Sequence, residues 1–167
     1  MDALGEGFIL DLAHRRLCGL ALASLGSFRQ WQPFARVNGS PVLEGLEGTT
    51  KIRLLLDTGS SGFTLLSTPR LSSIVRDAKV LRSIQVPSFG RMLTVGELRT
   101  AKALVMLGQP VKLTAVYSLD DHDVEEMLRG AGLNGLIGLR PFVGGAIAFN
   151  VPNKRTAFGQ LQRPLVH

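Results

Sequence analysis

The segment KIRLLLDTGSSGFTLLS, residues 51–67, constrains the fold more than any other part of the sequence. An apolar run typical of a β-strand leads directly into Asp57, and a second apolar run follows the glycine-rich turn. This order predicts a strand, a tight turn and a strand, with the acid at the end of the first strand. Gly59 permits the tight backbone, and the following amides and the Ser60 hydroxyl can donate to the carboxylate. We therefore expect Asp57 at the bottom of a cleft on a rigid turn.

Most of the remaining sequence also has the pattern of short strands separated by turns. The 19 glycines and 8 prolines lie between short runs rich in Val, Leu and Ile, which favours a mainly β chain. Asn38-Gly39 predicts a hairpin turn because both residue types tolerate positive φ. Further strands and hairpins are predicted in residues 8–20, 31–37, 91–119 and 146–159.

One helix is predicted clearly, in the segment LDDHDVEEMLRGAG of residues 119–132. It has an aspartate at a plausible N-cap and acids in the first turn. Val124, Met127 and Leu128 stand at helical spacing, and Gly130 is a stop signal. Residues 70–82 are expected to form a short helix or an irregular loop.

The segment around Asp57 resembles the active-site strand and turn of pepsin-like and retropepsin-like aspartic proteases. LNGLIGL, which contains Gly138, resembles the element that packs beside the aspartate turn in that family, and AFNVPNKRTAFG resembles its closing strand pair. The resemblance covers about residues 31–160. It implies an all-β, closed-barrel acid-protease lobe with one or two short helices over residues 31–167.

The resemblance also implies a role for each matching residue. Asp57 would be one of two carboxylates that share a proton and activate a water for attack on a peptide bond. Thr58 would brace two active-site turns against each other, and Ser60 would orient the carboxylate. Gly59 would allow the turn, and Gly138 would let the neighbouring strand approach closely. The implied function is that of an aspartic endopeptidase acting on peptide or protein substrates, without a cofactor.

The sequence holds one Asp-Thr-Gly, so Asp57 needs a partner carboxylate from elsewhere. A homodimer is the first expectation, because a twofold axis would bring two copies of Asp57 together. A second lobe is the other arrangement, suggested by the similarity between residues 8–17 and residues 147–156, in which Asp11 corresponds to Asn150. A non-catalytic or truncated lobe that binds peptides or partners is the alternative function.

Residues 1–30 are expected to be an N-terminal extension. They are interpreted either as the tail of a preceding lobe or, from LCGLALASLG after Arg15 and Arg16, as a weak signal-like segment. That apolar stretch is too short to span a bilayer, so membrane association is not expected. The compartment stays open between cytoplasmic and periplasmic or secreted.

The sequence departs from the resembling family's pattern at two residues and on the flap. Asn134 and Asn150 stand where the family often has aspartate. There is no obvious flap tyrosine, because Tyr117, the only tyrosine, lies too close to the second motif for that role. The flap is expected within residues 86–100, with Gly90 and Gly96 at a hairpin tip.

Composition argues against other classes of function. The formal net charge is +6, but the basic residues are scattered and only 6% of residues are aromatic, so a nucleic-acid partner is not expected. With Cys18 as the only cysteine, a cysteine-rich zinc site is not possible, and His14, His122 and His167 stand in unlike contexts. No metal site is therefore predicted.

Overall fold

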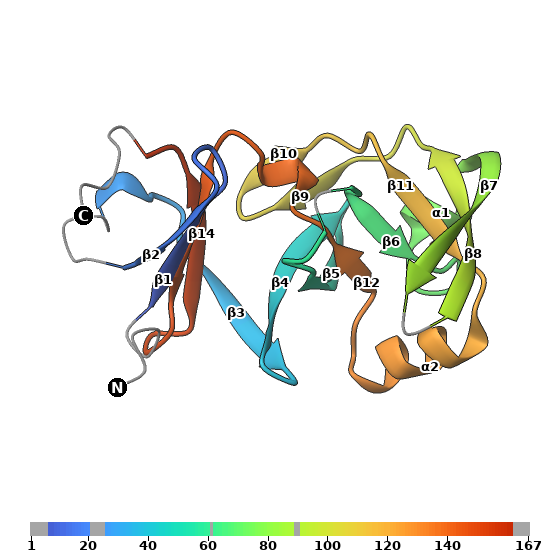
Figure 1. The fold of residues 1–167 in the computed structure, drawn as a ribbon, viewed down its shortest axis with the longest axis horizontal. Helices are drawn as coiled ribbons and strands as arrows, with labels where there is room; N and C mark the ends of the chain where they lie inside the picture. The colour runs from blue at the N-terminus through green and yellow to red at the C-terminus, as the bar shows by residue number, and fades with distance from the viewer. Residues whose placement is uncertain (1–6, 21–25, 61, 89–90, 162–167) are drawn as a thin grey trace. The chain divides into compact units, whose positions relative to one another are not determined.

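The computed structural model describes residues 7–20, 26–60, 62–88 and 91–161 (Figure 1). Strands dominate and helices are short, so the mainly β class expected from the sequence is confirmed. The chain divides into two compact units, one made of residues 1–35 with 142–167 and the other of residues 36–141.

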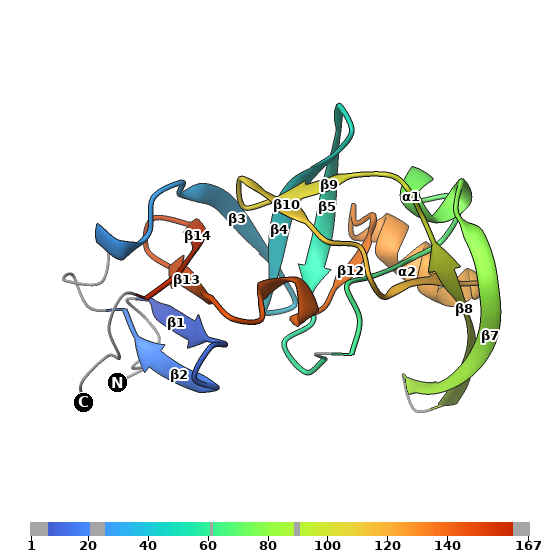
Figure 2. The same ribbon diagram turned by 90° about the horizontal axis from the view of Figure 1, so that it is seen from above.

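The first unit is built on an antiparallel sheet with the strand order β2-β1-β13-β14-β3. Its strands are β1 (Phe8–Asp11), β2 (Arg16–Gly19), β3 (Gln32–Val37, which continues into the second unit), β13 (Ala146–Asn150) and β14 (Arg155–Gly159). The two hairpins predicted in residues 8–20 and 146–159 are confirmed, and β1 and β2 lie side by side in both views (Figures 1 and 2). Part of the expected N-terminal extension thus shares a sheet with the closing strand pair, and the division of the chain at residue 30 stays a prediction.

Small and aromatic side chains fill the core of this first unit. Ile9, Phe28 and three alanines of β13 and β14 form one buried apolar cluster. The ring of Phe149 stacks on Phe8 with centroids 4.7 Å apart and meets Phe34 edge-on at 5.3 Å. Burial and mutual packing of these rings stabilise the sheet.

The second unit contains the remaining strands, in the order β10-β9-β4-β5-β12-β6-β11-β8-β7. Their bounds are β4 (Ser40–Glu47), β5 (Thr50–Leu56), β6 (Leu65–Ser67), β7 (Lys79–Ser88), β8 (Arg91–Arg99), β9 (Leu104–Met106), β10 (Gln109–Val111), β11 (Val116–Leu119) and β12 (Gly135–Ile137). Within the described residues no ladder joins β10 to β7, so this strand order is open. The closed barrel stays a prediction.

Two turns in the second unit use left-handed backbone. Asn38 and Gly39 have φ of +50° and +82°, which is the geometry that a two-residue hairpin between β3 and β4 requires. The predicted hairpin is therefore confirmed. Leu107 and Gly108, with φ of +51° and +73°, form the corresponding turn between β9 and β10.

The predicted helix is confirmed as α2 (His122–Gly130), with Oδ1 of Asp121 accepting a 3.0 Å hydrogen bond from the Val124 amide. Its buried face contains Glu125 rather than the expected Met127, which is 51% exposed. Val124, Glu125 and Leu128 project from one side of the helix, and Met127 lies off that side. Other short helices in the described ranges include α1 (Ser73–Arg76) and the 3-10 helix η2 (Arg140–Phe142).

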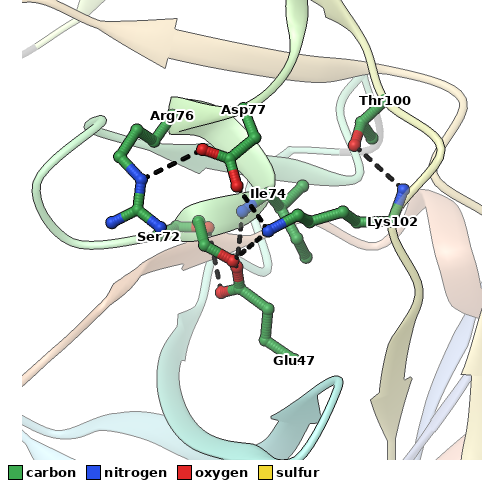
Figure 3. Close-up of polar contacts among 8 residues, drawn as sticks. Glu47, Ser72, Ile74, Arg76, Asp77, Thr100 and Lys102 are labelled. Carbon is green, nitrogen blue, oxygen red and sulfur yellow. Dashed lines mark hydrogen bonds and ion pairs between the residues drawn. The ribbon is translucent and has the colours of Figure 1, made fainter.

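A buried carboxylate at the end of β4 holds the start of α1 (Figure 3). Glu47 is 8% exposed and accepts hydrogen bonds from the Ser72 hydroxyl at 3.2 Å, from the Ser73 hydroxyl and from the Ile74 amide. These bonds satisfy groups at the helix start that no intrahelical partner serves. The single carboxylate therefore connects β4 to a segment that is distant in sequence.

Lys102 extends this network on the exposed side. Its ammonium group donates to the Ser73 hydroxyl at 2.7 Å and to Oδ2 of Asp77 at 2.6 Å, and Asp77 also pairs with Arg76 (Figure 3). The Lys102 and Arg76 bonds lower the pKa of the Asp77 carboxyl. Because these groups are open to solvent, their pairs are weaker than the buried bonds of Glu47.

Candidate active site

Asp57 follows directly on β5, as predicted from the sequence. In β5 the side chains of Ile52, Leu54 and Leu56 are buried. Every second side chain therefore anchors the strand in the apolar core. The Asp57 amide donates to the carbonyl of Ile137 at 2.9 Å, continuing the parallel pairing of β5 with β12. The acid is half-buried and is positioned by two strands of the sheet.

The turn after Asp57 orients its carboxylate through the backbone. The Gly59 amide donates to Oδ1 of Asp57 at 3.0 Å, and the Ser60 amide donates to the Asp57 carbonyl at 3.3 Å. In the described part of the chain, the hydroxyls of Thr58 and Ser60 make no hydrogen bond to this carboxylate. Their expected roles in bracing and orienting the site stay predictions.

Gly138 lies beside this turn, immediately after β12. Its amide donates to the Thr64 carbonyl at 3.3 Å, and the next amide, of Leu139, donates to the Ser60 carbonyl at 2.8 Å. A Cβ at position 138 would lie 2.4 Å from the Phe63 carbonyl oxygen. The close approach leaves room only for glycine at this position.

A cavity of about 610 Å³ opens in front of Asp57 within the second unit. Four of its lining residues carry a carboxyl or aliphatic hydroxyl group: Ser40, Asp57, Thr58 and Ser60. Most of the rest are apolar, namely Leu55, Leu56, Phe63, Leu66, Ile84, Val86, Leu93, Val95, Leu119 and Leu136, with Tyr117 and Gly62 beside them. Among the lining residues that the structure describes, Asp57 is the only carboxylate.

Part of the wall of this cavity falls within residues 86–100, where the flap is expected, and part comes from Ile84, Tyr117 and Leu119 outside that range. Ile84 and Val86 lie on β7, and Leu93 and Val95 lie on β8, which pairs with β7 along a long hairpin (Figure 2). Alternation of apolar residues at these positions was the available sequence signal, because alternate residues of a strand face the same side.

The expected flap falls on this hairpin. Gly90, the predicted tip, lies outside the described residues. Gly96 lies inside β8, opposite Ser83 of β7 and Ser118 of β11, and therefore not at a tip. Tyr117 on β11 lines the cavity. From the sequence, this residue is considered only for the flap, and is rejected there.

Asn134 has a structural role next to the end of β12 and β5. Its Oδ1 accepts from the Arg53 amide at 2.9 Å, and its Nδ2 donates to the Leu71 carbonyl at 3.0 Å. A carboxylate could make the first bond but not the second, since it has no donor when ionised. The amide thus connects β5 to the loop before α1.

A second cavity of about 410 Å³ lies near the start of α2, lined by Pro69, Arg70, Leu119, Asp120, Asp121, His122 and Glu125. Glu125 is buried and its carboxylate pairs with Arg70 at 3.3 Å and Arg129 at 3.4 Å. No group of three or more His, Cys, Asp or Glu side chains in the described ranges could hold a metal ion. Likewise, no helix among the described residues is long and apolar enough to cross a membrane.

Comparison with known proteins gives few matches. No protein-family model and no curated protein matches this sequence. Among solved structures, a retropepsin-like aspartic protease from Rickettsia conorii is similar, with a TM-score of 0.43 and 14% identity over 78% of this chain and 93% of that chain. Similarity at this level establishes neither the family nor the activity of this chain.

Proposed function

We propose that this chain contributes one Asp57-bearing lobe of an aspartic endopeptidase. One observation carries the proposal: a carboxylate held by the Gly59 amide at the end of a buried strand is the only carboxylate among the described residues that line a mostly apolar cavity of about 610 Å³. Such a cavity suits an extended peptide with apolar side chains beside the bond to be cut.

The chemistry requires two carboxylates. Two acids at contact distance cannot both ionise cheaply, so they share one proton, and the ionised one activates a water while the protonated one donates to the peptide carbonyl. Asp57 by itself can provide only one of these functions. A second copy of the chain or a second lobe would provide the other carboxylate.

The supporting residues are assigned to the same proposal. Gly59 fixes the carboxylate through its amide, and Gly138 allows β12 to approach the turn. Thr58 and Ser60, which line the cavity, would contact the partner turn and the carboxylate once the second half of the site is in place. The rival function is a lobe that binds peptides in the same cavity without cutting them.

The test compares the wild-type chain with Asp57→Asn and with Asp120→Asn, an exposed aspartate that serves as the matched control. A mixture of unstructured peptides is incubated with each protein from pH 3 to pH 8 and the products are read by mass spectrometry. Asp57→Asn should lower the rate by a factor on the order of a hundred to ten thousand, which is typical for loss of a general acid or base. Asp120→Asn should leave the rate unchanged.

The same assay, run over a series of protein concentrations, distinguishes a site formed by two copies of the chain from one completed by a second lobe. If two copies form the site, the rate per chain rises with concentration until the dimer is saturated. Peptide binding without cleavage by any of the three proteins would favour the rival function. Cleavage that persists in Asp57→Asn would refute the proposal.

A further inference from the structure

A row of paired residues crosses the sheet of the second unit along the wall of the cavity of about 610 Å³. Leu136 of β12 lies opposite Leu66 of β6, Leu66 lies opposite Tyr117 of β11, and all three line the cavity. The row continues through Glu97 of β8 to Arg82 of β7. Because residues directly opposite each other have side chains on the same face of a sheet, the row leads from the apolar wall of the cavity to two charged groups.

The two charged residues of this row form an ion pair. Nε of Arg82 donates to Oε2 of Glu97 at 2.5 Å, and the two side chains are 70% and 22% exposed. The hydrogen bond to Glu97 raises the pKa of the Arg82 guanidinium, and Tyr117 acts in the same direction. Tyr117, which lines the cavity, is therefore also close to the ion pair.

Two further cations lie on this face of the β7–β8 hairpin. Arg99 follows Glu97 by two residues on β8, and alternate residues of a strand face the same side. Lys79 of β7 lies directly opposite Arg99, and the register shift between Val80 and Arg82 brings Lys79 and Arg82 to the same face. Like charges directly opposite each other on paired strands are destabilising.

The repulsion between these two cations is not relieved within the described part of the chain. Lys79 and Arg99 are both exposed, and neither has an ion-pair partner among the described residues. Asp77, two residues before Lys79, already pairs with Arg76 at 3.0 Å and with Lys102 at 2.6 Å (Figure 3). The neighbouring carboxylate is therefore used by other cations.

The charge on this face favours an anionic ligand. Three cations, Lys79, Arg82 and Arg99, stand with the single carboxylate of Glu97, so these four side chains carry a net charge of +2. A carboxylate placed between Lys79 and Arg99 would replace their repulsion by two attractions, and a cation there would add to it. Clusters of this kind recognise acidic side chains of peptides.

We propose that the peptide bound in the Asp57 cavity carries an acidic side chain, which Lys79 and Arg99 bind at the base of the β7–β8 hairpin. Apolar side chains of the same peptide occupy the cavity, and the acidic one lies beyond Tyr117, at a distance from the bond to be cut. This inference rests on the proposed function, because it names the class of substrate for that cavity. Lys79 and Arg99 determine specificity and take no part in the chemistry.

The probes are three peptides of one apolar sequence that carry Glu, Gln or Lys at a single position, which is moved along the peptide one residue at a time. Their binding to the Asp57→Asn chain, which does not cut them, is measured by fluorescence anisotropy at fixed ionic strength. At one position, Glu should bind about threefold to tenfold more tightly than Gln, and Lys should bind more weakly than Gln by a similar factor. Cleavage of the same peptides by the wild-type chain is measured separately as kcat/KM.

A charge reversal tests the assignment to these two cations. With Lys79→Glu and Arg99→Glu added together, the order of affinities should reverse, so that the Lys peptide binds most tightly. A reversed order can arise only from a folded chain. The matched control carries Lys51→Glu and Lys112→Glu, which change the net charge equally at exposed positions outside β7, β8 and β11. This control should keep the order of the parent chain.

Several outcomes would overturn the inference: equal binding of the three peptides at every position, no binding of any peptide up to about millimolar concentration, or an order unchanged by the reversal. Reversal by the control as well would show an effect of net charge alone and would also overturn it. Preferential binding of the Glu peptide without cleavage by the wild type would refute the endopeptidase and leave this inference standing. Asp57-dependent cleavage with no preference for Glu would do the opposite.

Discussion

Gly138 packs directly against the backbone of Phe63, so that a Cβ at position 138 would come within 2.4 Å of the Phe63 carbonyl oxygen. The Ser60 carbonyl oxygen, on the turn that carries Asp57, would be 3.0 Å from the same atom. Both neighbours are backbone, which cannot rotate away as a flexible side chain can. The end of β12 and the Asp57 turn are thus held together by a contact that admits no side chain.

We expect Gly138→Ala to lower the free energy of unfolding by about 2 kcal/mol or more, because relief of the clash requires a shift of the Asp57 turn. Urea denaturation measures this change. Gly130→Ala is the matched control: a Cβ there meets nothing within 4 Å, so stability should be unchanged or about 0.5 to 1 kcal/mol higher. Equal midpoints for Gly138→Ala and the wild type would show that the turn can yield without cost.

Asn134→Asp should destabilise the second unit by about 1 to 3 kcal/mol, since the new carboxylate would face the Leu71 carbonyl instead of donating to it. The loss should be smaller below the pKa of the new carboxyl, where the protonated acid can donate again. Urea midpoints at pH 3.5 and pH 7 test this. Gln109→Glu, the same exchange of amide for carboxylate at an exposed position, should change neither midpoint by more than about 0.5 kcal/mol. An unchanged midpoint for Asn134→Asp at pH 7 would contradict the role of this amide.

Removal of the buried carboxylate at the end of β4 should loosen α1. We expect Glu47→Ala to cost about 1 to 3 kcal/mol, because Ser72, Ser73 and the Ile74 amide lose their acceptor in a buried place. Hydrogen exchange at the Ile74 amide should rise as well. Glu44→Ala on the same strand removes an exposed carboxylate and should have little effect. If both variants unfold at the same urea concentration, the network of Figure 3 does not stabilise the fold.

The free energy of unfolding at acidic pH should depend on Asp11. Burial alone raises the pKa of this carboxyl, but hydrogen bonds from Arg16 and His14 lower it by more, so that its pKa lies below the usual 3.8. With a folded pKa below the unfolded one, the stabilisation is complete above about pH 4 and is lost as the pH falls through the folded value.

Asp11→Asn tests this linkage and copies the residue that the second hairpin has at Asn150. The variant should be less stable than the wild type at pH 6, and its unfolding free energy should fall less steeply below pH 4. Asp120→Asn, at an exposed position, should keep the slope of the wild type. If the plots of unfolding free energy against pH are parallel for Asp11→Asn and the wild type, Asp11 does not contribute to the loss of stability in acid.

Local sequence determined the elements whose signals lie within a few residues. Asn38-Gly39 could be predicted as a hairpin turn because few residue types accept its backbone angles, and α2 because its cap and its apolar spacing agree. The place of Asp57 at a strand end followed from the apolar run before it. In these cases the residues of one short segment determine its conformation through backbone preference, capping and apolar spacing.

Tertiary structure decided what depends on contacts between distant segments. The walls of the Asp57 cavity come from β7, β8 and β11, and no local pattern shows which strand faces which. The same holds for Glu125, which is buried on α2 and pairs with Arg70 from another segment. Sequence determined which residues could form strands, turns and a held carboxylate, whereas long-range packing decided which of them meet, because that choice depends on the burial of the whole chain.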